Sequence, residues 1–389
     1  MKIGILTMPL HINYGGTLQA FALQKVLKDM GHEAWLIRRE PYLNHNLDYW
    51  IRTNIGNIIR YLRHQELRRW TWLSPKPAPD KKVVERNIQA FVDKWIEPKT
   101  EYIYSTDGLK EDLRKKNYKA YIVGSDQVWR PYYNSSTLLN FWLDFLGDNH
   151  DIMRIAYAAS FGTNKWEYKG KTHKECQKLA HKFNAISVRE ESGVGLLQEK
   201  FGVMDAKHVL DPTLLLTKND YLDLISADNQ YNDKKFLMSY LLDFKDGNIK
   251  MIADLAMEKG LAVRAIRPQK KAAEYRLGDN DEDFVIPPIE EWLQGFIDAE
   301  YVITDSFHGT VFSIIFNKPF VTIGNQVRGM ARLESLLHKF GLEERFLTNG
   351  NINKLKILID KKIDWEKVNQ KHDDLRKKSL DFLSITLKD

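Results

Sequence analysis

A histidine at a strand-to-helix turn is the strongest candidate for chemistry in the sequence. The stretch "YVITDSFHGTVFSIIFNKPF" joins an apolar strand to an apolar helix through Asp305, Ser306, Phe307, His308, Gly309 and Thr310. Amides around Gly309 and Thr310 should form a cradle for an anion, because helix N-termini attract negative charge. His308 would then transfer a proton beside that anion. The structural alternative makes Ser306 an N-cap and His308 a buried hydrogen-bonding residue.

A polar turn after the apolar strand at 118–124 is the second candidate. Its stretch "VGSDQVWR" contains Gly124, Ser125, Asp126, Gln127 and Trp129. Polar groups at the end of a buried strand need partners or a ligand, because an unpaired buried polar group costs ~1–3 kcal/mol. We therefore expect this turn to face a binding cleft. The alternative is that Ser125 and Asp126 only cap a following turn.

Two further junctions carry glycine or arginine where a ligand could approach. The stretch "HINYGGTLQAFAL" opens a helix with Asn13, Tyr14, Gly15, Gly16 and Gln19. Glycine lets the backbone come close to a ligand, although a tight turn alone would also explain the pair. At the end of the strand "AISVREE", Arg189 could bind a carboxylate or phosphate bidentately. It could equally form a structural ion pair, with Glu190, Glu191 or Asp211.

Alternating strand and helix patterns position these turns. Apolar runs predict strands at 2–7, 33–38, 118–124, 154–160, 184–190, 234–242, 261–266, 301–305 and 319–324. Helical periodicity follows most of them, as in "LQAFALQKVLKDMG" and "NIKMIADLAMEKG". The pattern restarts after "HVLDPTLLL", which predicts an α/β fold with two Rossmann-like domains, 1–214 and 215–389. They should face a cleft, because open parallel sheets bind ligands beyond the carboxyl ends of their strands.

Composition narrows the class of protein. The 389 residues carry a net charge of +6, and the only cysteine is Cys176, so neither a disulfide framework nor a thiolate zinc site is expected. No apolar run is long enough to predict a membrane span. No acidic or histidine cluster has metal-ligand spacing, so we expect no metal and no cofactor. We expect a cytoplasmic protein.

An insertion at about 41–80 separates the second strand from the next helical pattern. Its segment 49–73 combines apolar residues at helical spacing with basic and aromatic residues, including Arg60, Arg63, Arg68, Arg69, Trp50, Trp70 and Trp72. A basic amphipathic helix with tryptophans at its ends suits the anionic inner face of a membrane, so peripheral contact there is one expectation. The alternative is a helix that packs on its own domain. No nucleic-acid module accompanies the patch, so no nucleic-acid partner is expected.

Five motifs resemble the polysaccharide pyruvyl transferase family, over roughly residues 1–340. They are "NYGGTLQAFAL", "VGSDQVWR", "SVREESG", "LDPTLLL" and "AEYVITDSFHGTVFSIIFNKPFVTI". The resemblance implies a fold similar to the glycosyltransferase-B type, with phosphoenolpyruvate as donor substrate. A saccharide acceptor, whether lipid-linked or not, would receive a pyruvate ketal on two hydroxyl groups in capsule, exopolysaccharide or cell-wall glycan synthesis. His308 matches the family's histidine, which implies a general acid, and Arg189 matches its strand-end arginine.

The chain departs from the family at Ser306, where many members carry an arginine. A donor with a carboxylate and a phosphate needs cationic partners, and we expect Arg328 or Arg332, with Arg267 behind them, to compensate. The donor would lie among Arg189, Ser306, Phe307, Gly309, Thr310, Arg328 and Arg332. The acceptor would lie among Asn13, Tyr14, Gly15, Gly16, Gln19, Gly124, Ser125, Gln127, Trp129 and Asp305. Asp126 or Glu190 would take protons from the acceptor, and the sequence does not decide between them.

Two other functions are consistent with the same fold, because a fold alone does not fix chemistry. One is a glycosyltransferase that uses a nucleotide sugar, although no signature of a nucleotide pocket is visible. The other is a non-catalytic saccharide-binding relative that lost the donor arginine at Ser306. The retained His308 counts against the second alternative.

Overall fold

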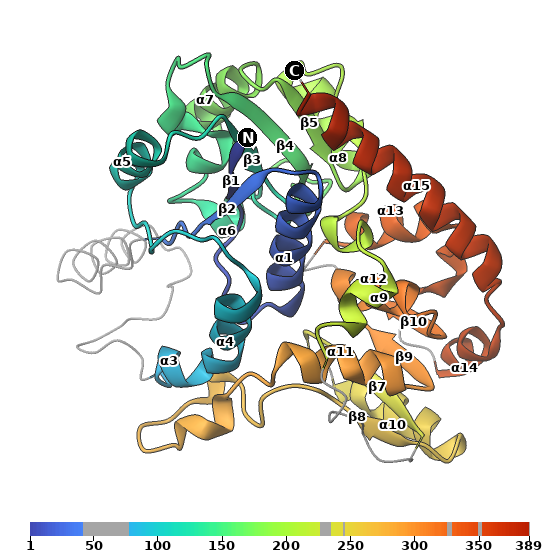
Figure 1. Cartoon of the computed structure of the whole chain (residues 1–389). Helices are drawn as coiled ribbons and strands as arrows, with labels where there is room; N and C mark the ends of the chain where they lie inside the picture. The colour runs from blue at the N-terminus through green and yellow to red at the C-terminus, as the bar shows by residue number, and fades with distance from the viewer. Residues whose placement is uncertain (42–77, 226–234, 244–245, 325–328, 349–351, 389) are drawn as a thin grey trace, which may run out of the picture.

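Two parallel sheets surrounded by helices make up the chain (Figure 1). The computed structural model describes residues 1–41, 78–225, 235–243, 246–324, 329–348 and 352–388. The α/β class with two Rossmann-like sheets is thereby confirmed, whereas the division at 214/215 stays a prediction. The basic segment 49–73 lies outside the described residues.

The first sheet has the strand order β2-β1-β3-β4-β5-β6. Its strands are β1 (Lys2–Leu6), β2 (Glu33–Ile37), β3 (Ala120–Val123), β4 (Met153–Ala159), β5 (Ala185–Val188) and β6 (Lys207–His208). Central strands read as continuous apolar runs because both of their faces are covered, as in β3, where every residue is buried. The order reverses between β1 and β3, so a crevice opens where these two strands end.

The second sheet has the order β11-β10-β9-β7-β8. Its strands are β7 (Phe236–Tyr240), β8 (Ala262–Arg264), β9 (Tyr301–Thr304), β10 (Phe320–Ile323) and β11 (Phe346–Leu347). Here the order reverses between β7 and β9, which gives the second sheet its own crevice. The loops after β1, β3, β5 and β9 contain the turns that the sequence singled out.

Helices connect the strands, and two of them begin at the crevices. The longer described helices are α1 (Tyr14–Asp29), α4 (Arg86–Trp95), α5 (Thr106–Lys116), α7 (Gly170–Ala180), α8 (Glu191–Leu196), α10 (Asp246–Glu258), α11 (Ile289–Asp298), α12 (Phe307–Ile315), α13 (Ala331–Phe340), α14 (Ile352–Asp360) and α15 (Trp365–Thr386). Short helices are α3 (Lys81–Val84), α6 (Pro131–Asn134) and α9 (Lys218–Leu222). Because α1 follows β1 and α12 follows β9, their N-termini point at the space between the sheets.

The last helix links the two halves. In Figure 1, α15 runs from the second sheet back beside β5 and α8 of the first sheet. The Ser379 hydroxyl accepts a hydrogen bond from the Leu210 amide at 3.0 Å, and the Phe382 ring lies 6.2 Å from the ring of Tyr157. Apolar residues of both halves belong to one buried cluster, including Leu18 and Trp292. The two sheets therefore share a core.

Candidate active site

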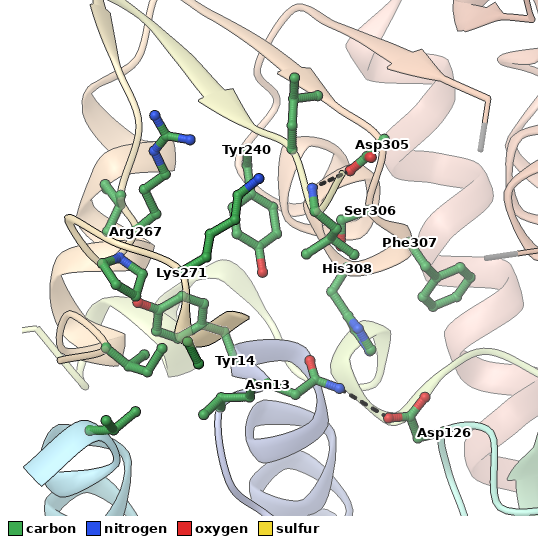
Figure 2. Close-up of a pocket in the computed structure, with 18 of the residues that line it drawn as sticks. Asn13, Tyr14, Asp126, Tyr240, Arg267, Lys271, Asp305, Ser306, Phe307 and His308 are labelled. Atoms are coloured by element: carbon green, nitrogen blue, oxygen red, sulfur yellow. Dashed lines mark hydrogen bonds between the residues drawn. The ribbon is translucent and has the colours of Figure 1, made fainter. Parts of the chain in front are cut away.

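A cavity of about 760 Å³ lies where the two crevices meet (Figure 2). The first half supplies Asn13, Tyr14, Asp126 and Gln127 to its wall, and the second half supplies Tyr240 and the turn from Asp305 to His308. The two loops of the second crevice are joined, because the Asp305 carboxylate accepts hydrogen bonds from the Leu242 and Asp243 amides at 2.6 and 3.1 Å. The switch points of both sheets thus form one site.

His308 lies at the centre of this site, in the first turn of α12. Its ring packs against Gly15 in the first turn of α1, so closely that a Cβ on Gly15 would lie 2.0 Å from Nδ1. The residue is 6% exposed, and Nε2 has no hydrogen-bond partner among the described residues. Asp211 is the nearest carboxylate, with 3.8 Å between Nε2 and Oδ2. An imidazole held in this way is suited to proton transfer with a molecule in the cavity.

Asp126 faces the same cavity from the turn after β3. Its backbone has a φ of 64°, and its carboxylate accepts hydrogen bonds from the Asn13 amide group at 3.2 Å and from Arg189 at 3.0 Å. Figure 2 shows the His308 ring directed toward Asn13 and Asp126. Burial would raise the pKa of Asp126, but the positive charges of Arg189, His308 and Arg332 outweigh it and lower the pKa below its ordinary value. Asp126 is therefore an anion next to the candidate acid.

Arg189 lies beneath the cavity and does not line it. Its side chain is fully buried between Asp126 and Asp211, with 2.7 Å between Nη1 and Asp211 Oδ2. Burial would raise the pKa of Asp211, but the nearby His308 and Arg189 hold it well below its ordinary value. Arg189 thus forms a structural ion pair with Asp211, as the alternative interpretation of the sequence expected. It fixes the two carboxylates that face the histidine.

Arg332, one of the arginines expected to bind the donor, lines the cavity. It is buried at the start of α13 and lines the wall, and its guanidinium carbon lies 5.8 Å from the centre of the Phe307 ring, which Arg189 contacts at 4.5 Å. Burial and the neighbouring Arg189 lower the pKa of Arg332 to about 10, so it stays charged at neutral pH. Arg328 lies outside the described residues.

The predicted anion cradle at Gly309 and Thr310 needs correction. The Gly309 amide donates to the Ser306 hydroxyl at 3.3 Å, and the Thr310 amide donates to the Ser306 carbonyl at 3.0 Å. Both amides are used inside α12, because Ser306 is its N-cap. The cavity wall at this turn is formed instead by the side chains of Ser306, Phe307 and His308.

Glu190 is placed differently from Asp126. It is fully buried, and one carboxylate oxygen accepts hydrogen bonds from the Ser160 hydroxyl and from the Phe161 and Gly162 amides, at 3.0, 2.7 and 3.1 Å. Burial raises its pKa, with Arg189 and Arg332 acting in the opposite direction. Glu190 does not line the cavity, so Asp126 is the acidic residue of this pair that a bound molecule would meet.

Several residues predicted at the cleft support it from behind. Gln19 accepts the Ser125 amide at 2.8 Å, and the Ser125 hydroxyl donates to Asp211 at 2.9 Å. Trp129 is fully buried and stacks on Trp142, with 4.1 Å between ring centres. The predicted residues that do not line the cavity are Gly15, Gly16, Gln19, Gly124, Ser125, Trp129, Arg189, Gly309 and Thr310. These residues lie behind the cavity wall in this structure, and their contact with a ligand stays a prediction.

The structure adds residues that the sequence did not single out. Tyr240, Lys271 and Tyr133 line the cavity, and so does Arg267, which was named only as a distant candidate. In the view of Figure 2, Arg267 and Lys271 lie on the left of the cavity, away from His308, with Tyr240 nearer the centre. The basic stretch "IRPQKK" after a predicted strand was the signal that could have found this side.

No helix among the described residues has the length and apolar character needed to cross a bilayer. Among the same residues, no three His, Cys, Asp or Glu side chains gather in a way that could hold a metal ion.

Solved structures similar to this chain share its fold at low sequence identity. The UDP-GlcNAc 2-epimerase from Neisseria meningitidis, bound to UDP-GlcNAc, has a TM-score of 0.53 at 8% identity, over 100% of this chain and 99% of the other. The UDP-GlcNAc 2-epimerase from Methanocaldococcus jannaschii has a TM-score of 0.52 at 13% identity, over 95% of each chain. These likenesses confirm the glycosyltransferase-B-like fold.

Comparison of the sequence itself identifies the family. A search of curated proteins finds no match. The model of the family described as polysaccharide pyruvyl transferase matches residues 13–327, which include the turns that hold Asn13, Asp126, Arg189 and His308. The chain belongs to the polysaccharide pyruvyl transferase family.

Proposed function

We propose that the protein transfers the pyruvyl group of phosphoenolpyruvate to two hydroxyl groups of a saccharide, forming a ketal. The observation that carries the proposal is the position of His308. Its ring is buried against Gly15, its Nε2 has no hydrogen-bond partner among the described residues, and it faces a cavity that also holds an anionic Asp126. Membership of the family supports the same activity.

The proposed reaction proceeds in two additions. His308 protonates the methylene carbon of the enol phosphate, which turns the double bond into a methyl group next to an oxocarbenium-like centre. One sugar hydroxyl attacks this centre and loses its proton. Phosphate then leaves with the C–O bond electrons, and the second hydroxyl attacks and loses its proton to close the ketal. One hydroxyl proton restores His308, and the other leaves with phosphate.

The side chains around the cavity suit these steps. Asp126 would stabilise the developing positive charge, since preorganised charge acts most strongly in a water-poor site. It would also accept a hydroxyl proton and pass it on to His308 or to the departing phosphate. Arg332, Arg267 and Lys271 would bind the carboxylate and phosphate of the donor, in place of the arginine that Ser306 replaces. We also propose that the reaction needs no metal ion and that the product belongs to a surface polysaccharide or cell-wall glycan.

Titration calorimetry in metal-free buffer tests the donor first. We expect saturable binding of phosphoenolpyruvate and none of uridine diphosphate. His308→Gln should retain donor binding within a few-fold, because the cations remain, but should lose about 10²–10⁴ in the rate of phosphate release with an acceptor. The control is His338→Gln, since the side chain of His338 is 72% exposed.

Three other results would contradict the proposal. Binding of uridine diphosphate alone would replace the proposal with a nucleotide-sugar transferase. Acceptor-saturated His308→Gln protein that releases phosphate as fast as the wild type would show that another group is the acid. Saccharide binding without any donor binding would indicate the non-catalytic relative.

A further inference from the structure

A pair of adjacent tyrosines projects at the edge of the cavity. Tyr132 and Tyr133 belong to α6, with ring centres 5.1 Å apart and planes at 75°. Tyr132 is 74% exposed and Tyr133 is 42% exposed. Aromatic side chains usually stabilise a protein by being buried, and these two rings are exposed to solvent instead. An exposed aromatic pair next to a pocket indicates a surface that binds a ligand.

A hydrogen-bond network around the buried Arg130 holds the backbone beneath these rings. Arg130 is 7% exposed, and its Nε donates to Glu167 at 3.2 Å while its Nη1 donates to Gln127 at 3.0 Å. The second oxygen of Glu167 accepts the Tyr132 amide at 3.3 Å. The Arg130 guanidinium also lies 5.4 and 4.9 Å from the centres of the two rings. The rings are therefore preorganised, which reduces the entropy lost when a ligand stacks on them.

The tyrosine pair adjoins the part of the cavity that contains Asp126 and His308. Tyr133 lines the same cavity as Asp126 and His308, and Gln127 stands between Asp126 and Arg130 in both sequence and contacts. Tyr133 is also close enough to Arg332 to influence its pKa. Tyr132, the more exposed ring, extends this wall toward solvent.

We infer that Tyr132 and Tyr133 form a platform for a second sugar ring of the acceptor, next to the ring that receives the pyruvyl group. A pyranose presents C–H groups on its faces and hydroxyl groups on its rim, so it stacks on an aromatic ring while its rim stays hydrated. The inference rests on the proposed function in one respect, that the cavity takes a saccharide. It adds which residues recognise the neighbouring sugar, namely Tyr132 and Tyr133.

The test uses simple sugars and no donor. Saturation-transfer NMR and titration would compare lactose, cellobiose and N,N′-diacetylchitobiose with galactose, glucose and N-acetylglucosamine. We expect at least one disaccharide to bind the wild type about fivefold or more tighter than its monosaccharide. Tyr132→Ala and Tyr133→Ala should each remove most of that gain, whereas Tyr132→Phe and Tyr133→Phe should keep it.

A matched control is Tyr104→Ala, because Tyr104 is 49% exposed and does not line the cavity. Equal affinity for mono- and disaccharides, or a disaccharide gain that survives both alanine variants, would overturn the inference. Loss of the gain in the phenylalanine variants would overturn stacking in favour of the hydroxyl groups. Because no donor is present, failure here leaves phosphoenolpyruvate binding unaffected, and failure of donor binding leaves the platform measurable.

Discussion

At the residue scale, the contact between Gly15 and His308 determines where the imidazole of the candidate acid can lie. A glycine in the first turn of α1 is less favourable for helix formation than alanine by up to about 1 kcal/mol. The structure shows the reason for it, since the imidazole of His308 occupies the space of a Cβ. Ring placement and helix propensity therefore favour different residues at position 15.

Gly15→Ala separates these two effects. The new methyl group would displace the His308 ring, so we expect phosphate release to fall about 10²-fold, as a shift near 1 Å can cause. Thermal stability should change little, because the helix gains propensity while the ring is strained. Enzyme assays and circular dichroism melting of the same preparation measure both. Full activity in this variant would show that the ring position is unimportant.

At the scale of elements, α12 depends on a residue that also lines the proposed donor site. Ser306 caps the helix through the Gly309 amide and lines the cavity. Ser306→Ala should lower the free energy of unfolding by about 1 kcal/mol and leave phosphoenolpyruvate affinity near the wild-type value. Ser306→Asp should keep the cap but weaken donor binding about tenfold, because it adds a negative charge to the wall. Equal loss of donor affinity in both variants, measured by calorimetry, would contradict this division of roles.

The loop between β1 and α1 is held by a partly buried ion-pair cluster that no sequence pattern predicted. His11 lies 3.0 Å from Glu40 and 3.3 Å from Glu85, two residues before the Asn13 that contacts Asp126. Burial alone would lower the pKa of His11, but its pairing with both carboxylates raises it to about 9. His11 is therefore protonated at neutral pH and connects the cavity loop to both flanks of the insertion.

The raised pKa of His11 sets a pH window for stability. The pKa of His11 in the folded state lies above its ordinary 6.5, so protonation of His11 stabilises the folded protein. This stabilisation is complete below about pH 6.5 and is lost as the pH rises through about 9. We expect His11→Gln to lower the free energy of unfolding by about 1–3 kcal/mol at pH 6.5 and by much less at pH 9.5. Urea unfolding of both proteins across this range measures the difference. A difference that does not depend on pH would rule out the ion pair as its source.

At the scale of the whole molecule, the sequence predicted the strand segments along the chain and the turns that follow them better than the direction of side chains. Apolar runs followed by polar turns mark β3 and β9 in any parallel fold, so the turns at Asp126 and His308 were predictable. Whether a polar side chain faces the cavity or another side chain depends on tertiary contacts. Arg189 forms ion pairs with two carboxylates and Trp129 stacks on Trp142, whereas Tyr133 lines the cavity.

The C-terminal helix α15 was not predicted from the sequence. Because it contacts both halves, the unfolding of the protein can show whether the two halves are stable separately. Leu383 of α15 is fully buried in the cluster shared by both halves. Leu383→Ala should lower the free energy of unfolding by about 2–5 kcal/mol. Because the sheets share this core, calorimetry should show one transition in the wild type and one transition at lower temperature in the variant.

The surface change Leu277→Ala is the control, since Leu277 is 89% exposed and its loss should matter by no more than about 0.5 kcal/mol. Two separate transitions in the wild type would mean that the halves fold independently and that α15 only lies across them. One shared transition would mean that the crevices are held together as the chain folds. The distance between His308 on one half and Asp126 on the other would then be set by the fold before any substrate binds.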